Sequence, residues 1–534
     1  MTPLPGGFDL PYRALPAFKA LLAATAFALL ALDWYLGERA PARWTRMRNT
    51  ALGAIGLLSI AAWFGFGAFH GANRPLHLHD FYHYYTGSKY FAELGYTRLY
   101  QCTAVADAQD GRARDVAARW TRNLHTNILE RRLPTQAETQ DCLSRFGPDR
   151  WDAFRADVAW FRGRMRAADW DGVPGVFGHN ATPAWNAMGF WLANASPASD
   201  AQMLALAAFD PILIAALWTL LWRTFGWQGA AVGAIWWGLN ETAGFHWIGG
   251  GFLRQDALFL LVMAVCALRT GRRGLAGAAL GTAALLRAFP LFLLAGFGLK
   301  IAADAHTRGI RHALVEHRAF LAGAAGAALL ILAFTAVTWH GRAGGTVEPW
   351  RAFTENSRKH LDTPVRSHLG LKPALWFDPG TRGAMMMGYW IDGPWDSWMA
   401  ARRATLESRR PLSYAIVAGF VLLFWRFARR AEPWAVVAAG VLLLPFMTTL
   451  ASYYYSTLLL VGLFWPRDRL VGVGLAALTA LTAVLPPLLE QRDDRYTVIS
   501  AALVVFAFVA VVRLARQPRE APAVPATSAA GTIS

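Results

Sequence analysis

The sequence predicts an all-α protein that crosses a membrane many times and carries a large polar domain between two of its crossings. Hydrophobic residues make up 55% of the 534 residues, and the chain holds 24 tryptophans. Apolar windows of roughly 18 to 23 residues recur, each long enough to cross a hydrocarbon core of about 30 Å. The short loops between these windows are rich in arginine, as the positive-inside rule expects of cytoplasmic loops.

We attribute the formal net charge of +17 to arginines that orient the chain in a membrane. Its arginines lie in the short loops and form no single basic patch, so we expect membrane lipids as partners and no nucleic acid. The first apolar run lacks a small-residue cleavage site and should be retained as a span. The abundance of Ala, Arg and Gly suggests a bacterial inner (plasma) membrane protein.

Residues 1–69 hold a short polar tail and the first two spans, near 17–36 and 50–69. Four arginines follow Glu38 in the loop between the spans, which places that loop in the cytoplasm. The second span therefore delivers residues 70–200 to the outer face. We expect a polar extracytoplasmic loop domain there, built largely of short amphipathic helices.

Residues 201–339 contain further spans and one broken run, 274–299. One basic loop precedes this run and another follows it, while Arg287 and Pro290 interrupt its middle. Proline breaks the helical hydrogen-bond ladder, and a buried arginine needs a partner. We expect a hairpin that enters from the cytoplasm and returns, with Arg287 beyond the midplane, because one ordinary crossing would place every later arginine-rich loop outside.

The remaining chain divides into a second extracytoplasmic loop at 340–410, C-terminal spans at 411–514 and a disordered cytoplasmic tail at 515–534. The sum is about eleven crossings and the hairpin. Cys102 and Cys142 share the outer domain. An oxidising compartment would permit a disulfide, and two free thiols are the alternative.

Asp80 is the candidate catalytic residue. It directly follows the second span, among aromatic residues that suit a membrane surface. A carboxylate there can take a proton from an attacking hydroxyl. Alternatively, it merely caps a helix that begins at Phe81. His77, His79 and His83 have spacing that could ligate a metal with Asp80. Histidines among tyrosines usually only form hydrogen bonds, so we expect no metal and no other cofactor.

Arg287 is the second candidate, because its guanidinium could clamp a phosphate that reaches into the bilayer. The alternative is an ion pair with Glu241 or Asp256. Arg254 follows three consecutive glycines and, with Asp256, could complete the same pocket. A local Arg254–Asp256 pair is the simpler explanation.

Further substrate-binding candidates flank these anchors. In the first segment they are the neighbours of Asp80, namely His79, His83, Tyr84, Tyr85 and Lys89. In the second outer loop they are Glu355, Asn356, Arg358, Lys359 and His360. That charged run could instead be a solvated face. Tyr454 could stack on a sugar ring or belong to the aromatic belt of the membrane surface.

Several motifs, taken in order, resemble the glycosyltransferase C superfamily, and most closely glycosyltransferase family 87, the polyprenyl-phosphate mannosyltransferase-like membrane proteins. The Asp-Phe-x-x-Tyr-Tyr stretch of that family matches Asp80 to Tyr85, and its Gly-x-x-Leu-Tyr element matches Gly95 to Tyr100 with one extra residue. Its glycine-rich span with a central Lys and a following Pro is similar to Gly277 through Pro290, with Arg287 in the Lys position.

Two later elements match more loosely. Glu355 to Ser357 resembles a Glu/Gln-x-Asn-Ser element without its spacer, and Ser452 to Tyr455 resembles a late Ser-x-x-Trp-x-His-Tyr-Tyr element. The chain departs from the family in three places. The segment between Tyr100 and His179 is longer, a Pro-Pro motif is replaced by Ala181–Pro183, and the late His is absent.

The resemblance implies a glycosyltransferase C-like bundle whose active site faces the extracytoplasmic side. Asp80 would be the general base, and Arg287 would hold the departing phosphate of a polyprenyl-phosphate hexose or pentose donor. The sugar would pass, with inversion, to a lipid or cell-envelope glycan acceptor. Two other functions stay open: a transporter or flippase of a lipid-linked anion, and an inactive relative that binds partners through residues 101–178.

Overall fold

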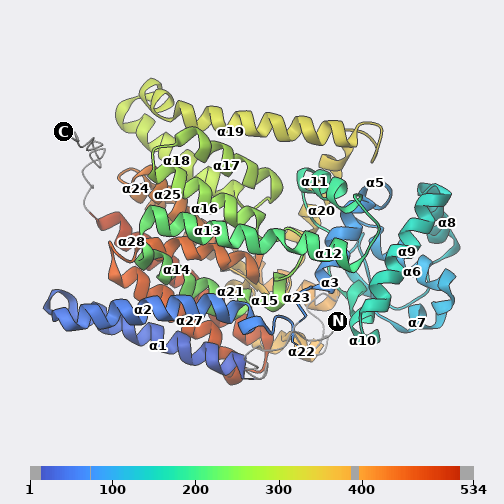
Figure 1. Cartoon of the computed structure of the whole chain (residues 1–534), viewed down its shortest axis with the longest axis horizontal. Helices are drawn as coiled ribbons and strands as arrows, with labels where there is room; N and C mark the ends of the chain where they lie inside the picture. Colours follow the sequence, from blue (N-terminus) through green and yellow to red (C-terminus); the bar gives the residue numbers. More distant parts are fainter. Residues whose placement is uncertain (1–13, 72–73, 387–395, 518–534) are drawn as a thin grey trace, which may run out of the picture.

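The computed structural model describes residues 14–71, 74–386 and 396–517. This part of the chain is almost wholly helical, with two small two-stranded sheets. Long helices lie side by side in a bundle, and a group of short helices, α6 to α10, projects from one end of it (Figure 1). Most of both predicted polar tails, 1–16 and 515–534, lies outside the described residues.

Six helices of the described chain are long and apolar enough to cross a membrane, which confirms an all-α membrane protein. They span Leu15–Arg39, Asp200–Phe225, Ile310–Trp339, Arg410–Ala428, Arg469–Leu488 and Arg492–Arg516. Shorter apolar helices accompany them at Arg273–Leu286, Pro433–Met447 and Ser452–Phe464. The count of eleven crossings stays a prediction.

The bundle helices and their bounds follow in chain order. They are α1 (Leu15–Leu36), α2 (Ala42–Trp63), α13 (Phe209–Phe225), α14 (Trp227–Leu239), α16 (Asp256–Arg269), α17 (Arg273–Leu286), α18 (Leu291–Arg308), α19 (Ile310–Trp339), α24 (Arg410–Ala428), α25 (Pro433–Gly440), α26 (Leu444–Met447), α27 (Arg469–Leu488) and α28 (Arg492–Arg516).

The run Ser452–Phe464 is a 3₁₀ helix of 13 residues. Its higher rise carries it about 26 Å, against about 20 Å for an α-helix of equal length. Gly462 lies directly against Gly233 of α14, where an added Cβ would come within 2.5 Å of backbone nitrogen. A short apolar run therefore extends through most of the bundle.

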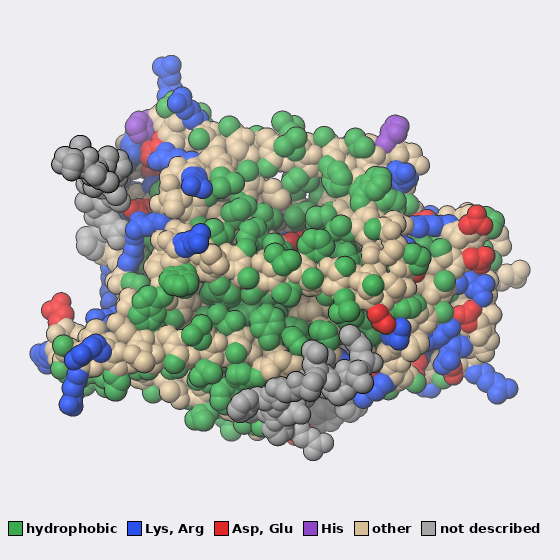
Figure 2. Space-filling model, viewed as in Figure 1, with side chains coloured by type: hydrophobic (Ala, Val, Ile, Leu, Met, Phe, Trp, Pro, Cys, Tyr) green, Lys and Arg blue, Asp and Glu red, His purple; other side chains and the backbone are tan. Residues whose placement is uncertain are grey.

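Ion pairs join the arginine-rich loops at one end of the bundle. Glu432 contacts both Arg269 and Arg467, at 3.1 and 3.5 Å. Asp468 pairs with Arg513 at 2.9 Å. A hydrophobic band covers the visible side of the bundle, with basic side chains at this end and mixed charges on the opposite, projecting domain (Figure 2). The loops that the sequence assigns to the cytoplasm thus share one end.

Helices α17 and α18 form a hairpin whose tip is the stretch 287–290. Both legs return to the arginine-rich end, because Arg273 donates to the Glu316 carbonyl at 2.6 Å and Arg308 pairs with the Glu316 carboxylate at 3.1 Å. The first leg packs closely on α19, since a Cβ on Gly277 would lie 1.9 Å from the Phe320 carbonyl oxygen. The hairpin tip therefore lies at the end that carries the outer domain.

The outer domain, residues 74–199, is built from short elements that follow the second bundle helix. They are α3 (Leu78–Phe81), α4 (Gly87–Lys89), α5 (Phe91–Leu94), α6 (Leu99–Asp107), α7 (Ala113–Ala118), β1 (Thr121–Asn123), β2 (Ile128–Glu130), α8 (Gln136–Arg145), α9 (Pro148–Arg164), α10 (Ala167–Gly172) and α11 (Pro183–Ala193). The next helix, α12 (Asp200–Ala207), begins the candidate span Asp200–Phe225. The β1–β2 hairpin, antiparallel with Thr121 opposite Glu130, is an addition to the helices that the sequence predicts.

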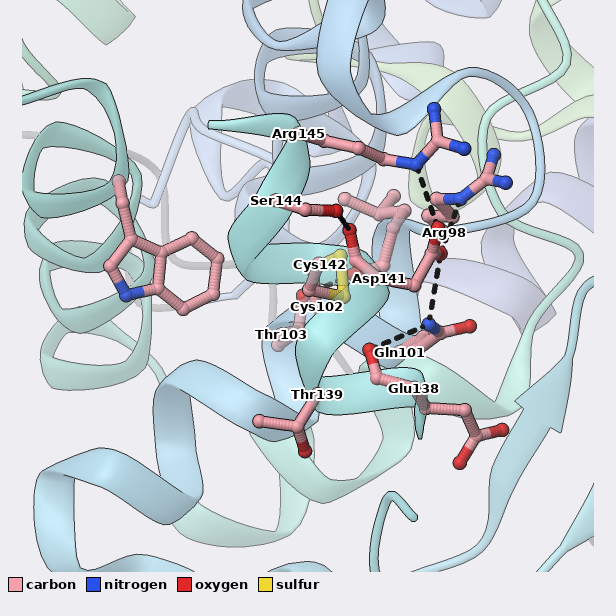
Figure 3. The surroundings of a disulfide bond; sticks show 12 residues. Arg98, Gln101, Cys102, Thr103, Glu138, Thr139, Asp141, Cys142, Ser144 and Arg145 are labelled. Atoms are coloured by element: carbon pink, nitrogen blue, oxygen red, sulfur yellow. Dashed lines mark hydrogen bonds and ion pairs between the residues drawn. A yellow bond between two sulfur atoms is a disulfide. The ribbon is translucent and has the colours of Figure 1, made fainter. Parts of the chain in front are cut away.

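Local chemistry fixes several of these boundaries. Thr135 and Glu138 form a capping box at the start of α8, and Ser199 caps α12. Cys102 of α6 and Cys142 of α8 form a disulfide (Figure 3). The sequence left open a disulfide or two free thiols, and the structure contains the disulfide.

The second outer loop packs against the same end of the bundle. Its elements are α20 (Glu348–Leu361), β3 (His368–Leu369), α21 (Leu371–Leu375), α22 (Gly383–Met386) and α23 (Asp396–Ser408). β3 pairs with β4 (Leu450–Ala451), which precedes the 3₁₀ helix. A buried ion pair of 2.7 Å between Arg402 and Asp493 joins α23 to α28. The two outer segments are thus held over one end of the membrane bundle.

Candidate active site

Asp80 lies on α3, where its carboxylate is not a helix cap. The helix begins at Leu78, and the ring of His77 accepts the hydrogen bond of the Asp80 amide at 3.1 Å. The capping alternative, which began the helix at Phe81, is therefore wrong. The Asp80 side chain is 12% exposed, and its Oδ2 has no hydrogen-bond partner among the described residues.

Arg254 is the charged neighbour of Asp80. Its Nε lies 3.4 Å from Asp80 Oδ2, so the local Arg254–Asp256 pair considered from the sequence is replaced by this longer-range contact. The guanidinium lies 4.1 Å from the Tyr84 ring centre and 5.4 Å from that of Tyr453. Burial raises the pKa of Asp80, and the positive charges of Arg254 and Arg287 offset part of this increase.

The loop of three glycines brings Arg254 to this position. The His77 amide donates to the Gly250 carbonyl at 3.0 Å. A Cβ on Gly250 would lie 1.8 Å from the Pro75 carbonyl oxygen, and one on Gly251 would lie 2.4 Å from Asp80 Oδ2. The close approach of this loop to Asp80 therefore requires glycine.

Asp210 fixes the far side of the loop. Its two carboxylate oxygens accept hydrogen bonds from the amides of Arg254 and Gln255, both at 3.0 Å. Asp210 is not among the residues predicted from the sequence. An acidic residue inside an otherwise apolar run was the signal that could have identified it.

Arg287 lies at the hairpin tip and pairs with Asp256, with 3.3 Å between Nε and Oδ1. Its Nη2 donates to the Leu253 carbonyl at 2.8 Å. The guanidinium also lies 5.2 Å from the Trp185 ring centre and 5.5 Å from that of Tyr84. Of the two partners considered from the sequence, the structure selects Asp256.

His179 and Trp185 complete the cluster and were missed by the sequence analysis. The His179 ring lies 5.3 Å from Tyr84 and 6.0 Å from Trp185. Its Nε2 contacts Asn186, while its buried Nδ1 has no hydrogen-bond partner among the described residues. A lone histidine in a loop gives no periodic signal that could have identified it.

A narrow pocket opens beside the two arginines, between the glycine loop, the hairpin tip and the start of the 3₁₀ helix. It is lined by Ile248, Arg254, Gln255, Ala257, Leu258, Arg287, Phe289, Tyr453, Tyr454, Ser456 and Thr457. Tyr454, one of the predicted binding residues, lines this pocket and packs 5.0 Å from Phe289. We call this pocket, with Asp80, Tyr84, His179 and Trp185, the arginine site.

Four predicted neighbours of Asp80 belong to the interior of the outer domain. Lys89 forms a buried ion pair of 2.8 Å with Asp157, and it also donates to the Tyr85 hydroxyl. His83 contacts the Tyr100 hydroxyl and the His79 carbonyl, both at 2.6 Å. We therefore leave Lys89, Tyr85, His83 and His79 out of the arginine site.

The predicted residues of α20 separate into two groups. Glu355, Asn356 and Lys359 line a second, larger cavity against the outer domain. His360 packs on Phe177, with 5.9 Å between ring centres, and the exposed Arg358 lines neither cavity. Residues that are neighbours in the sequence of α20 therefore lie in different surroundings.

The alternative of a metal site near Asp80 is weakened because the ring of His77, one of its predicted ligands, is engaged in other hydrogen bonds. The His77 ring contacts the Asp80 amide and the His246 carbonyl, at 3.1 and 3.0 Å. The described residues place metal-binding atoms together at Asp304, Glu316 and His317 instead. There Lys300 already lies 2.9 Å from Asp304, so an ammonium occupies the position of a cation.

Fold and site together define a membrane-embedded protein with two paired arginines and a buried carboxylate where its bundle meets an outer domain. Comparison of the chain with protein-family models, with curated proteins and with solved structures finds no match in any of the three.

Proposed function

We propose that the protein is a glycosyltransferase that moves a sugar from a polyprenyl-phosphate donor to a lipid or cell-envelope glycan, with Asp80 as general base. The observation that carries this proposal is the arrangement of Asp80 with its uncommitted Oδ2 beside two buried guanidinium groups. A base next to an anion site provides the two parts that transfer from a sugar phosphate needs.

The two arginines supply the anion site. Charge-assisted hydrogen bonds are about 2.7 to 2.9 Å long, whereas the Arg254–Asp80 and Arg287–Asp256 contacts are 3.4 and 3.3 Å. These longer pairs leave guanidinium N–H groups available to a phosphate. The Tyr84 ring lies beside both guanidinium groups.

The chemistry follows from this geometry. Asp80 takes the proton of an acceptor hydroxyl, whose oxygen attacks the anomeric carbon of the donor sugar. The bond from that carbon to the phosphate oxygen breaks, and the departing phosphate keeps the electron pair beside Arg287. Attack opposite the leaving group inverts the anomeric configuration. Burial supports the role of Asp80, because a raised pKa makes its carboxylate a stronger base.

Two features support an extracytoplasmic site in a bacterial inner membrane. The outer domain contains the Cys102–Cys142 disulfide, and disulfides persist in oxidising compartments. The arginine-rich loops lie at the opposite end, as the positive-inside rule expects of the cytoplasmic end. Single cysteines at Arg272 and Arg351, both exposed positions, should therefore label from opposite sides of sealed vesicles. Labelling of both from one side would overturn this orientation.

The decisive experiment measures transfer of radiolabelled sugar from polyprenyl-phosphate donors into lipid extract by full-length protein in nanodiscs. Asp80→Asn should lower transfer at least a hundredfold and leave donor binding intact. Asp152→Asn, at a side chain 74% exposed in the same domain, is the matched control. Lipid-phosphate binding that depends on Arg287, without transfer from any donor, would instead favour the transporter.

A further inference from the structure

A second cavity lies between the outer domain and the second outer loop. It has a volume of about 500 Å³, within the range of small-molecule sites. We call it the upper groove. Its lining residues are Phe91, Ala92, Glu93, Gly95, Tyr96, Thr97, Arg98, His125, Arg145, Ala343, Gly344, Glu348, Pro349, Ala352, Glu355, Asn356 and Lys359.

Charged groups of both signs line the upper groove, together with apolar side chains. Arg98 and Arg145 stand on the outer-domain side, and Glu355 is exposed on the α20 side. Carboxylates accept and guanidinium groups donate hydrogen bonds, so the set suits a ligand with many hydroxyl groups. A uniformly charged polymer would meet repulsion from half of them.

Asn356 gives the upper groove a buried polar group without a partner. It is 6% exposed, and its amide nitrogen donates to the Asn180 side chain at 2.9 Å. Its Oδ1 has no hydrogen-bond partner among the described residues. A buried carbonyl oxygen of this kind costs free energy until a donor reaches it, and a ligand hydroxyl would supply that donor.

A chain of contacting side chains links the upper groove to the arginine site. Tyr96 lines the groove, and its hydroxyl accepts a hydrogen bond from Asn186 at 3.4 Å. Asn186 contacts His179, whose ring packs on Tyr84 of the arginine site. The side chains of Tyr96, Asn186, His179 and Tyr84 therefore connect the groove to the arginine site.

The disulfide supports one side of this groove. Figure 3 shows Arg98 and Arg145 side by side, joined through Asp141. The carboxylate of Asp141 accepts from Arg98 at 2.7 Å and from Arg145 at 3.0 Å. Asp141 is adjacent to Cys142, so the bond to Cys102 holds both arginines in place on the groove wall.

We propose that the upper groove binds the acceptor as a glycan of two or more sugar units, holding the part that is remote from the reacting hydroxyl. This inference rests on the proposed transferase function and adds the class of its acceptor. Binding energy from a remote part of a substrate can orient its reacting group.

The test is isothermal titration of the full-length protein in nanodiscs with mannobiose, mannotriose and arabinobiose. We expect at least one to bind, and Glu355→Gln or Asn356→Ala to weaken binding roughly tenfold. Glu407→Gln, a carboxylate on α23 with 66% side-chain exposure, is the matched control and should bind as the wild type does. Asp80→Asn should also bind normally, because Asp80 does not line the groove.

The outcomes separate this inference from the proposed function. If Glu355→Gln weakens glycan binding but the protein shows no transfer activity, the groove assignment stands and the proposed transferase function is excluded. If the protein transfers sugar but neither groove variant changes the KM for the acceptor, the transferase function stands and the groove assignment is overturned. No binding of any oligosaccharide, or binding of short peptides in their place, would also overturn it.

Discussion

The Nε of Arg254 lies 3.4 Å from Oδ2 of Asp80, and neither atom has a hydrogen-bond partner among the described residues. This contact couples the proposed base to the proposed anion site. A donor phosphate that draws Arg254 away would leave Asp80 more basic at the moment when the acceptor hydroxyl must lose its proton.

The first prediction concerns the pH dependence of transfer. Burial raises the pKa of Asp80, and the charge of Arg254 lowers it in part. Arg254→Gln removes the lowering contribution, so the pKa of Asp80 should rise further. Because only the carboxylate form acts as base, the acid limb of the kcat profile should move to higher pH. Arg351→Gln on the second outer loop should leave the limb in place. An unmoved limb in Arg254→Gln would contradict the coupling.

The second prediction concerns the glycine loop. A Cβ on Gly251 would lie 2.4 Å from Asp80 Oδ2, so Gly251→Ala must displace the carboxylate or the loop. A displacement of about 1 Å at a reacting group can cost roughly a hundredfold in rate. We expect that loss in kcat with normal folding. Gly147→Ala, where no neighbouring atom lies within 4 Å of the added Cβ, should keep full activity. Equal activities would show that Asp80 does not need this position.

Much of the fold follows from the sequence because hydrophobic length and arginine placement are local signals. Apolar runs identify the membrane class, and the interruption at Arg287 and Pro290 identifies the hairpin. The shape of the outer domain does not follow in the same way. Its disulfide joins cysteines 40 residues apart, and its β1–β2 hairpin has strands of only three residues, too short for a clear alternating pattern.

The candidate site, like the fold, could be predicted from the sequence only in part. Asp80, Arg254 and Arg287 could be selected because charged residues at the edge of apolar runs are costly. Their pairing could not, since it depends on the path of the glycine loop. Lys89 was assigned to the site although it lies nine residues after Asp80, about half a helical turn away around the axis. The structure accordingly directs it to Asp157.

The third prediction separates the structural role of Arg287 from its proposed role in binding. Arg287→Gln leaves Asp256 without its ion-pair partner, and breaking a buried pair costs about 3 to 5 kcal/mol. The double variant Arg287→Leu/Asp256→Leu removes both charges and should recover most of the thermal stability. Its donor binding should stay lost, because no guanidinium remains for the phosphate. Donor binding by the stable double variant would exclude Arg287 from the anion site.

The last prediction uses the disulfide to connect stability with the upper groove. Cys102 and Cys142 are 40 residues apart, and closing a loop of this length contributes about 4 kcal/mol. The variant Cys102→Ser/Cys142→Ser should therefore lower the melting temperature of the outer domain, measured by differential scanning fluorimetry. It should also weaken oligosaccharide binding, because Arg98 and Arg145 would lose their fixed spacing across Asp141. Cys266→Ser, at the free buried cysteine of α16, is the control and should bind oligosaccharides as the wild type does. Unchanged glycan binding in a clearly destabilised double variant would show that the arginine pair does not belong to the binding surface.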